Sequence, residues 1–322
     1  MRISIAMATY NGAQHLHEQL DSIIRQTRAP DELVICDDGS TDETKKILDS
    51  FRQHAPFSVQ LHSNKYNLGH ARNFEKALSL CNGDIIFLSD QDDVWFPDKL
   101  ASVVECFNNH PGVDLVINDA FYTDKKSVQT GTTVLQKVLS VGGGKDSHIA
   151  GACSAITKRF RDFLVPFPTH CCPQHDVYIH RWTNLLGNKV LLDKPLQSWR
   201  IHDSNTTADN EMSRPEIDST ITRYIRSQNI NATESYIKRA EEFIEMRELL
   251  ETRIESLSAL PITPASDVVL LKINKIIHAN KNRSILTRLG WFERKWLVLS
   301  MALTGQYRYF KGLKSFAKDL IR

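Results

Sequence analysis

The stretch Ile85-Ile86-Phe87-Leu88-Ser89-Asp90-Gln91-Asp92-Asp93-Val94-Trp95 joins a short apolar run to three closely spaced acids. Consecutive large apolar residues are typical of a strand that is buried on both faces of a parallel sheet. Ligands bind at the carboxyl ends of such strands, and crowded carboxylates repel one another unless a cation lies between them. Such oxygen ligands suit Mg²⁺ or Mn²⁺. Alternatively, Asp92 or Asp93 only caps a helix that begins near Pro97.

The sequence around this stretch alternates predicted strands with predicted helices. The further strands are expected at residues 3–8, 33–36, 57–62, 113–118, 189–192 and 197–202. The segments between the earlier of these strands have apolar residues at helical spacing. Ser40 and Glu43 resemble a capping box at the start of one such helix. This rhythm predicts an α/β fold with a mostly parallel central sheet and helices on both faces. Beyond residue 214 the pattern is that of helices only.

The bulk composition is that of an ordinary globular protein, with 41% hydrophobic and 24% charged residues among 322. The net charge of +2 hides an asymmetry, because residues 272–322 hold 12 Lys and Arg but only Glu293 and Asp319 as acids. The six cysteines form no CxxC pair and are expected to be reduced. Adjacent Cys171 and Cys172 are either two thiols or a strained disulfide.

Two nucleotide-binding signatures do not occur in the sequence. There is no GxGxxG after the first strand and no GxxxxGK[ST], which argues against dinucleotide oxidoreductases and P-loop NTPases. The acids at 37–38 and 90–93 follow predicted parallel strands and should therefore gather along one edge of the sheet. They fit a nucleotide held through its base and ribose, with a metal bridging its phosphates. The alternative is that Asp37-Asp38-Gly39-Ser40 only forms a turn.

Four motifs resemble those of family 2 glycosyltransferases in order and spacing. They are Ala8-Thr9-Tyr10-Asn11-Gly12, Asp37-Asp38-Gly39-Ser40-Thr41-Asp42, Asn67-Leu68-Gly69-His70-Ala71-Arg72-Asn73 and the turn 90–93. The resemblance covers about residues 1–205 and is strongest to rhamnosyltransferase-like bacterial members. It implies a GT-A fold, a nucleotide-diphosphate sugar donor, a Mg²⁺ or Mn²⁺ cofactor and inversion of the anomeric centre. It also implies a catalytic domain at 1–210, with a nucleotide-sugar-binding half (1–120) and an acceptor-binding half (121–210), before a helical region at 211–322.

The resemblance also assigns the donor and metal residues. The nucleotide sugar should contact Thr9, Tyr10, Asp37, Asp38, Arg72, Asp90 and Gln91. Asp90 and Asp92 match the Asp-x-Asp pair of the family, with Asp92 as the direct metal ligand. His202, in a loop that resembles the one closing over the donor, is expected to complete the metal shell or touch the diphosphate. Alternatively, Arg72 is a solvated helix residue and His202 is structural.

The catalytic base and the acceptor side lie further along the chain. His175-Asp176 is similar to the acidic pair at a helix start that supplies the base of the family, which makes Asp176 the expected base. As an alternative, Asp176 is only a helix N-cap. The acceptor side is expected to include Trp95 as a stacking wall, together with Asn118, Asp119, Gly151, His175 and Arg200. Arg200 could also neutralise phosphate charge.

These features predict an inverting, metal-dependent glycosyltransferase that acts in bacterial surface polysaccharide or lipopolysaccharide assembly. The expected donor is a dTDP- or UDP-sugar, rhamnose being one candidate, and the acceptor is a saccharide or a lipid-linked saccharide. The alternative enzyme is a sugar nucleotidyltransferase, which would need a Gly-rich basic loop where Thr9-Tyr10-Asn11-Gly12 stands. The non-enzymatic alternative is an inactive transferase domain that serves as a scaffold.

The basic C-terminal segment 286–322 is rich in aromatic residues and has two open interpretations. It either lies on an anionic membrane surface or packs within the protein or a homodimer. No apolar stretch reaches the ~20 residues needed to span a bilayer. The apolar stretch at the N-terminus is too short for a signal peptide. A cytoplasmic location, peripheral at the inner face of the plasma membrane, is therefore expected. No recognised module indicates nucleic-acid binding.

Overall fold

The computed structural model describes residues 1–123, 129–140, 151–168, 174–201, 232–258, 260 and 264–321. The chain forms two compact units. The first contains residues 1–167, 172–217 and 259–263, and the second contains 168–171, 218–258 and 264–322. The predicted domain boundary at 210–211 lies outside the described residues.

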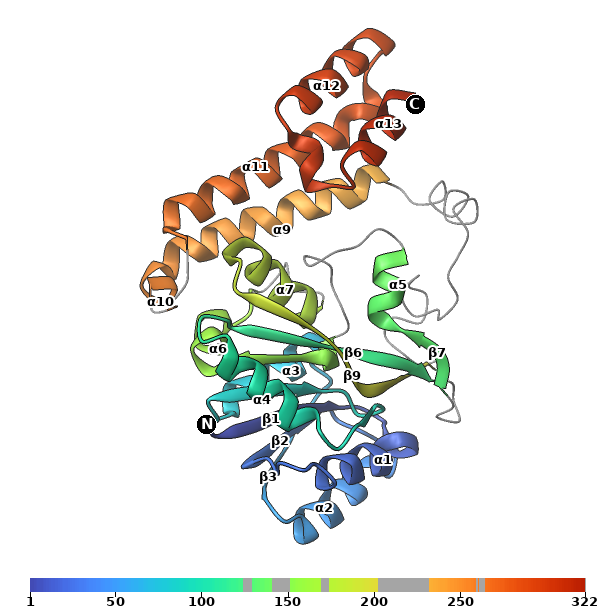
Figure 1. Ribbon diagram of the computed structural model, residues 1–322, viewed down its shortest axis with the longest axis vertical. Coiled ribbons are helices and arrows are strands. Elements are labelled where there is room, and N and C mark those ends of the chain that lie inside the picture. The colour runs from blue at the N-terminus through green and yellow to red at the C-terminus, as the bar shows by residue number, and fades with distance from the viewer. Residues whose placement is uncertain are drawn as a thin grey trace. The chain divides into compact units, whose positions relative to one another are not determined.

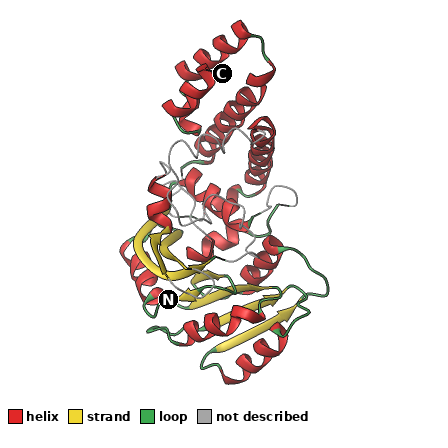
Figure 2. Ribbon diagram, turned by 90° about the vertical axis from the view of Figure 1, so that its right-hand side faces the viewer, coloured by secondary structure: helices red, strands yellow, loops and turns green. Residues whose placement is uncertain are grey.

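The first unit is built on one mixed sheet (Figures 1 and 2) with the strand order β3-β2-β1-β4-β8-β6-β9-β5, β7 pairing with β6. The strands are β1 (Ile3–Thr9), β2 (Glu32–Asp37), β3 (Ser58–Ser63), β4 (Ile85–Ser89), β5 (Val94–Trp95), β6 (Leu115–Thr123), β7 (Gln129–Thr133), β8 (Ser154–Thr157) and β9 (Lys189–Arg200). Strands β3, β2, β1 and β4 are mutually parallel, and their carboxyl ends therefore share one edge. This confirms the α/β prediction.

Helices cover both faces of this sheet. They are α1 (Ala13–Ile24), α2 (Thr44–His54), α3 (His70–Leu80), α4 (Lys99–Asn109), α5 (Val134–Ser140), α6 (Lys158–Leu164) and α7 (His175–Leu186). Leu16, Leu48 and Leu100 place α1, α2 and α4 in one core cluster with the odd-numbered residues of β1. Along the sheet, the connections from β1 to β2 and from β2 to β3 run one way, and the connection from β3 to β4 through α3 runs back. Because such crossovers are right-handed, α3 lies on the face opposite α1 and α2, where it contacts α7.

Several local predictions are wrong. The two strands expected at 189–192 and 197–202 are one continuous strand, β9, which ends at Arg200. Ser40 does not form a capping box, because α2 begins at Thr44 and Ser40 instead bonds to Asp37. The strand expected at 113–118 is β6, which runs in the same direction as β4 and pairs parallel with β9. It does not pair with β4, because β8, a strand that the sequence pattern did not identify, lies antiparallel between them.

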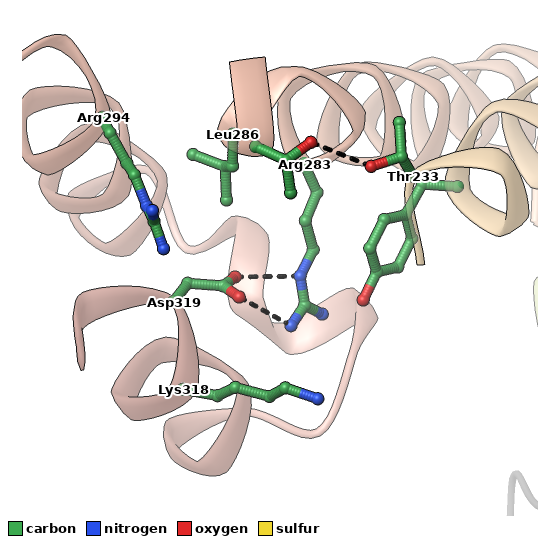
Figure 3. A pocket seen from close by; sticks show the side chains of 8 residues that line it. Thr233, Arg283, Leu286, Arg294, Lys318 and Asp319 are labelled. Carbon is green, nitrogen blue, oxygen red and sulfur yellow. Dashed lines mark hydrogen bonds and ion pairs between the residues drawn. The ribbon is translucent and has the colours of Figure 1, made fainter. Parts of the chain in front are cut away.

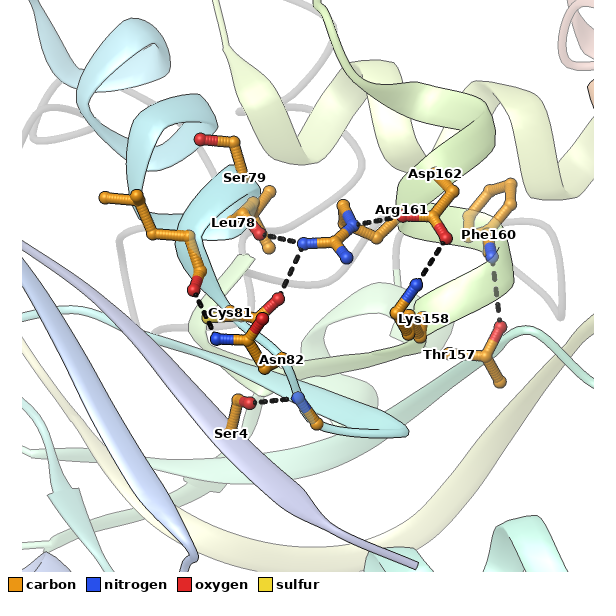
Figure 4. A network of polar contacts seen from close by, with 12 residues as sticks. Ser4, Leu78, Ser79, Cys81, Asn82, Thr157, Lys158, Phe160, Arg161 and Asp162 are labelled. Atoms are coloured by element: carbon orange, nitrogen blue, oxygen red, sulfur yellow. Dashed lines mark hydrogen bonds and ion pairs between the residues drawn. The ribbon is translucent and has the colours of Figure 1, made fainter. Parts of the chain in front are cut away.

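A buried arginine ties α6 to the end of α3 (Figure 4). Arg161 Nη1 donates to the carbonyl oxygens of Leu78 and Cys81, at 2.5 and 2.9 Å. These carbonyls belong to the last turn of α3 and the residue after it, where no N–H group of the helix remains to donate to them. The bond therefore holds the α3 face of the sheet together.

The described cysteines, Cys36, Cys81, Cys106 and Cys153, are buried and reduced, as the sequence predicts. Burial raises the pKa of Cys36 to about 11, so this thiol is unreactive at neutral pH. The question about Cys171 and Cys172 falls outside the described residues.

The described part of the second unit is helical. It contains α9 (Ala232–Thr252), α10 (Ile254–Ser258), α11 (Ser266–Ile285), α12 (Trp291–Leu303) and α13 (Leu313–Ile321), with 3₁₀ turns at Leu286–Arg288 and Gln306–Tyr309. Arg283 of α11 forms an ion pair of 2.9 Å with Asp319 of α13 (Figure 3). Tyr307 donates to the same carboxylate at 3.2 Å. A buried charge pair with this extra hydrogen bond fixes α13 against α11.

Candidate active site

The first two sequence motifs interlock at the carboxyl ends of β1 and β2. Asn11, with a positive φ of 47°, turns its side chain to accept from the backbone of Thr41 at 2.8 Å. The backbone N–H of Asn11 donates to Ser40 Oγ at 2.8 Å, and the backbone N–H of Gly12 donates to Thr44 Oγ1 at 2.9 Å. The two loops therefore form one rigid rim.

The acid turn is attached to the same rim through Gln91. Its side-chain amide accepts from Tyr10 N at 2.9 Å and donates to Tyr10 O at 3.0 Å. A methyl group on Gly12 would come within 2.1 Å of Gln91 Oε1, so a larger residue there would push the Gln91 side chain away from Tyr10. Gln91 thus holds the turn, whereas the Tyr10 side chain is 47% exposed and accessible to a ligand.

Asp37 and Asp38 are both buried and hydrogen-bonded at this edge. The Asp37 carboxylate accepts from Thr9 Oγ1 at 3.1 Å and from the backbone of Ser40 at 3.0 Å. Asp38 accepts from the backbone amides of Leu68 and Gly69, at 2.8 and 2.9 Å. The third motif is therefore bound to the second, and all four motifs meet at one end of the sheet.

Three carboxylates, Asp90, Asp92 and Asp176, converge beside His70. The Nε2 atom of His70 lies 3.6 Å from Asp90 Oδ1. Burial raises the pKa of Asp90, His70 opposes this, and the charges of Asp92 and Asp176 raise it further. Burial alone would lower the pKa of His70, but Asp90, Asp176 and Asp92 outweigh it, and the net shift is upward. The three carboxylates therefore concentrate negative charge here, and the His70 ring beside them is stabilised in its protonated form.

Asp176 lies in the first turn of α7 and directly against Gly151. A Cβ on Gly151 would come within 2.9 Å of both Asp176 Cβ and His175 Nε2. The N-cap of α7 is Gln174, so the interpretation of Asp176 as an N-cap is wrong. The His175 ring is buried and stacks on Phe74 at 4.0 Å, which fixes the start of α7 next to α3.

The donor set at this rim fits a divalent cation held partly by a ligand. Among the described residues no three His, Cys, Asp or Glu side chains form a metal cage. Mg²⁺ usually takes one or two carboxylates and completes its shell with waters and substrate phosphates. Asp90 and Asp92 offer such oxygen ligands, and their mutual repulsion is what a cation would relieve. Neither Asp92 nor Asp93 caps a helix, since α4 has Asp98 as its N-cap.

A buried polar network supports the acid turn from behind. Lys99 is 0% exposed and donates to the carbonyl of Ala152 at 2.8 Å and to the side chain of Gln197. Gln197 in turn donates to Asp93 Oδ2 at 2.7 Å. Burial lowers the pKa of Lys99 to about 8. Burial raises the pKa of Asp93 well above its usual value, and the charges of Asp92 and Asp90 add to this.

Arg200, predicted on the acceptor side or beside phosphate, makes its contacts within the first unit. Its Nε donates to the carbonyl oxygen of Asp92 at 3.0 Å, and its Nη2 pairs with Glu18 of α1 at 2.5 Å. The side chain is only 3% exposed, so Arg200 supports the acid turn rather than presenting its charge to an acceptor.

Other predicted residues are also engaged within the protein. Trp95 is 2% exposed and lies under Lys99, 3.9 Å from Nζ to the ring centroid, so its ring offers no wall to a sugar. Asn118 and Asp119 are buried in β6, where Asp119 accepts from the backbone of Leu135 at 2.9 Å. All three side chains are buried, and the roles of Asn118 and Asp119, like the rest of the predicted acceptor side, stay predictions.

Two further predictions concern charged residues. Arg72 pairs with Glu75 at 2.5 Å and donates to the carbonyl of Phe167 at 2.9 Å. His202 lies outside the described residues, and its predicted role stays a prediction.

The sequence reasoning missed His70 and the pair Lys99–Gln197. His70 stands inside a quoted motif, directly after a positive-φ glycine (Gly69) and at the first position of α3. Its place at a helix start near the acid turn was an available signal. Lys99 and Gln197 are far apart in sequence, and no local pattern indicated that they would meet.

The comparisons with known proteins agree with this geometry. The chain resembles a mannosyltransferase of Pyrobaculum calidifontis, solved in complex with GDP-Man and Mn²⁺, with a TM-score of 0.51 and 18% identity over 99% of this chain and 85% of the other. The fold is thus the GT-A fold of nucleotide-sugar transferases.

Sequence relatives define the family. The model of the family described as Glycosyl transferase family 2 matches residues 4–172. A glycosyltransferase of Nostoc sp. is 34% identical over 247 residues, which is 74% of each chain. The dTDP-rhamnosyl transferase RfbG of Shigella flexneri is 41% identical over 110 residues, covering 32% of this chain and 38% of its own. The protein belongs to glycosyltransferase family 2, which confirms the resemblance seen in its motifs.

Proposed function

We propose that this family 2 glycosyltransferase is an inverting enzyme that depends on a divalent cation. The observation that carries this proposal is the convergence of Asp90, Asp92 and Asp176 at the edge where the four motifs meet. Two of these acids follow β4, and the third lies in the first turn of α7, so different elements supply the groups proposed to serve the donor phosphates and the acceptor hydroxyl. When bound, the cation supplies charge that stabilises the departing diphosphate.

In this mechanism Asp176 is the general base. Its carboxylate takes the proton of the acceptor hydroxyl while that oxygen attacks C1 of the donor sugar from the face opposite the diphosphate. The C1–O bond to the diphosphate breaks as the new glycosidic bond forms, which inverts the anomeric centre. Gly151 and His175 keep Asp176 in position, because both lie directly against it.

The donor is proposed to be a dTDP- or UDP-linked sugar, with rhamnose as the first candidate. The relative RfbG, a dTDP-rhamnosyl transferase that is 41% identical over 110 residues, supports this choice. Thr9, Tyr10, Asp37 and Asp38 would line the nucleoside, with Tyr10 offering its exposed ring for stacking. The acceptor is proposed to be a saccharide or lipid-linked saccharide of surface polysaccharide assembly on the cytoplasmic side.

Titration calorimetry with UDP and dTDP, each with and without Mn²⁺, tests the donor side. We expect binding that needs Mn²⁺ and that is lost in Asp92→Ala. A donor screen read by mass spectrometry then identifies the sugar, and Asp176→Asn should lower transfer by about 10²–10⁴-fold. Nucleotide binding by Asp176→Asn should remain at the wild-type level.

Three outcomes would contradict the proposal. Loss of nucleotide binding in Asp176→Asn would remove this residue from the role of base. Equal binding with and without Mn²⁺, unchanged in Asp92→Ala, would rule out the cation at the acid turn. An intact site that binds nucleotide but transfers no sugar from any donor would favour the scaffold interpretation.

A further inference from the structure

The C-terminal helix α12 exposes a continuous apolar line. Phe292, Trp296, Leu299 and Leu303, which we call the α12 stripe, are 81%, 77%, 48% and 89% exposed. Their spacing of four, three and four residues places them on one face of a helix. Soluble proteins rarely expose contiguous apolar patches of this kind unless the patch binds something.

The stripe is not the side by which α12 packs in its own unit. Val298 and Met301 are fully buried in a cluster with Leu286 and Tyr307. In helix α12 these two residues lie away from the stripe, so the helix is apolar on two sides and only one of them has a partner within the described residues. A helix that is apolar on its solvent side needs a second apolar surface.

The following helix shows the same arrangement. Leu313 and Ile321 of α13 are 83% and 85% exposed, and Ala317 between them is exposed as well. Their spacing of four residues again defines one face of a helix. Within the part of the chain that the structure describes, two successive helices therefore each carry an exposed apolar line, which makes a chance exposure of single residues a poor explanation.

The charges around these lines identify the chemistry of the occupant. Residues 286–322 contain eight Lys and Arg but only two acids. Both acids serve internal contacts, since Asp319 pairs with Arg283 and Glu293 accepts from Gly290 N. The exposed charged residues of this segment are mostly basic, namely Arg288, Arg308, Lys311 and Lys314.

We infer that α12 and α13 form a surface that inserts shallowly into an anionic lipid leaflet. Trp and Phe on an exposed helix face, flanked by Lys and Arg, are the residues that such interfacial helices use. A second copy of this surface would bring like charges together, which disfavours self-association. None of the described helices could cross a membrane, so the contact is with the surface of the bilayer. The inference does not depend on the donor chemistry proposed above.

Vesicle flotation of the full-length protein tests this inference. We expect binding to vesicles that contain phosphatidylglycerol, little binding to pure phosphatidylcholine, and weakening by salt. Trp296→Ser/Leu303→Ser should lower the partition coefficient at least about tenfold, because both side chains lose apolar burial in the lipid. Lys311→Gln/Lys314→Gln should lower it by roughly tenfold or more on anionic vesicles only. Tyr66→Ser, which alters a 66% exposed residue of the first unit, is the matched control.

The tryptophans supply a second readout. Trp95, Trp182 and Trp199 are buried, whereas Trp291 and Trp296 are exposed, so a blue shift of emission on adding vesicles reports the C-terminal helices. Absence of vesicle binding by the wild type, or equal binding by Trp296→Ser/Leu303→Ser, would overturn the inference. So would a homodimer in light scattering that this double variant dissociates. Metal-dependent nucleotide binding is measured on the same variants. This measurement tests the transferase proposal separately, so a failure of vesicle binding is not mistaken for a failure of that proposal.

Discussion

Gly151 lies so close to Asp176 that a methyl group on its α-carbon would come within 2.9 Å of Asp176 Cβ. Real Cβ atoms do not approach other atoms this closely, so any larger residue here must move the start of α7. The candidate base is therefore positioned by the backbone of the segment Gly151–Cys153, which precedes β8. This contact links a central strand of the sheet to the proposed chemistry.

Gly151→Ala should impair catalysis more than donor binding. The added methyl group displaces Asp176 and His175, and a shift of about 1 Å in a reacting group can lower the rate by about 100-fold. Transfer rate and nucleotide affinity, measured together, check this, with Gly290→Ala as a control because the atom nearest its new methyl group would be 3.7 Å away. A Gly151→Ala enzyme with wild-type turnover would show that Asp176 is not held by this contact.

Gln91→Leu should loosen the acid turn with little cost to folding. The variant removes both hydrogen bonds to the backbone of Tyr10, but these groups are exposed and water can replace the amide. We expect donor affinity to fall by about tenfold, since Asp90 and Asp92 are no longer held against the first motif. Calorimetry with nucleotide and Mn²⁺ checks this against Gln53→Leu on the exposed side of α2. Equal affinities would mean that the turn is rigid without Gln91.

Gln197→Leu should destabilise the first unit. It leaves the buried side chains of Lys99 and Asp93 each without one hydrogen bond, at a cost of about 1–3 kcal/mol per unsatisfied group. Denaturant unfolding measures the loss. Lys158→Met breaks an exposed ion pair with Asp162 and should change the free energy of unfolding by less than about 1 kcal/mol. Similar values for both variants would contradict a structural role for the network.

Glu32 should make stability fall in acid. Burial would raise the pKa of Glu32, but hydrogen bonds from Ser4 and Asn82 and the charge of Arg2 outweigh it and lower the pKa below its ordinary 4.5. The carboxylate therefore stabilises the folded state fully above pH 4.5, and this contribution is lost as the pH falls through the lowered pKa. The difference in the free energy of unfolding between the wild type and Glu32→Gln, measured from neutral to acidic pH, should shrink only below pH 4.5. A constant difference would rule out this linkage.

Much of the catalytic half could be predicted from local pattern. The apolar run at 85–88, and the strand-like segments at 3–8 and 33–36, are buried in parallel strands as expected. Acids that follow parallel strands must share an edge, whatever the details of side-chain packing. The meeting of the four motifs at that edge follows from this topology alone.

What the sequence determined by itself is the class of fold, the family and the edge of the sheet at which the four motifs meet, because hydrophobic periodicity and short motifs are local properties. Only the tertiary structure decided which of the predicted side chains are packed inside the protein. Trp95, Asp119 and Arg200 look like binding residues in the sequence, yet long-range packing buries them against Lys99, the backbone of α5 and Glu18. Side chains of these types serve equally well in a core network or at a surface, and that choice depends on partners up to 182 positions away in the chain.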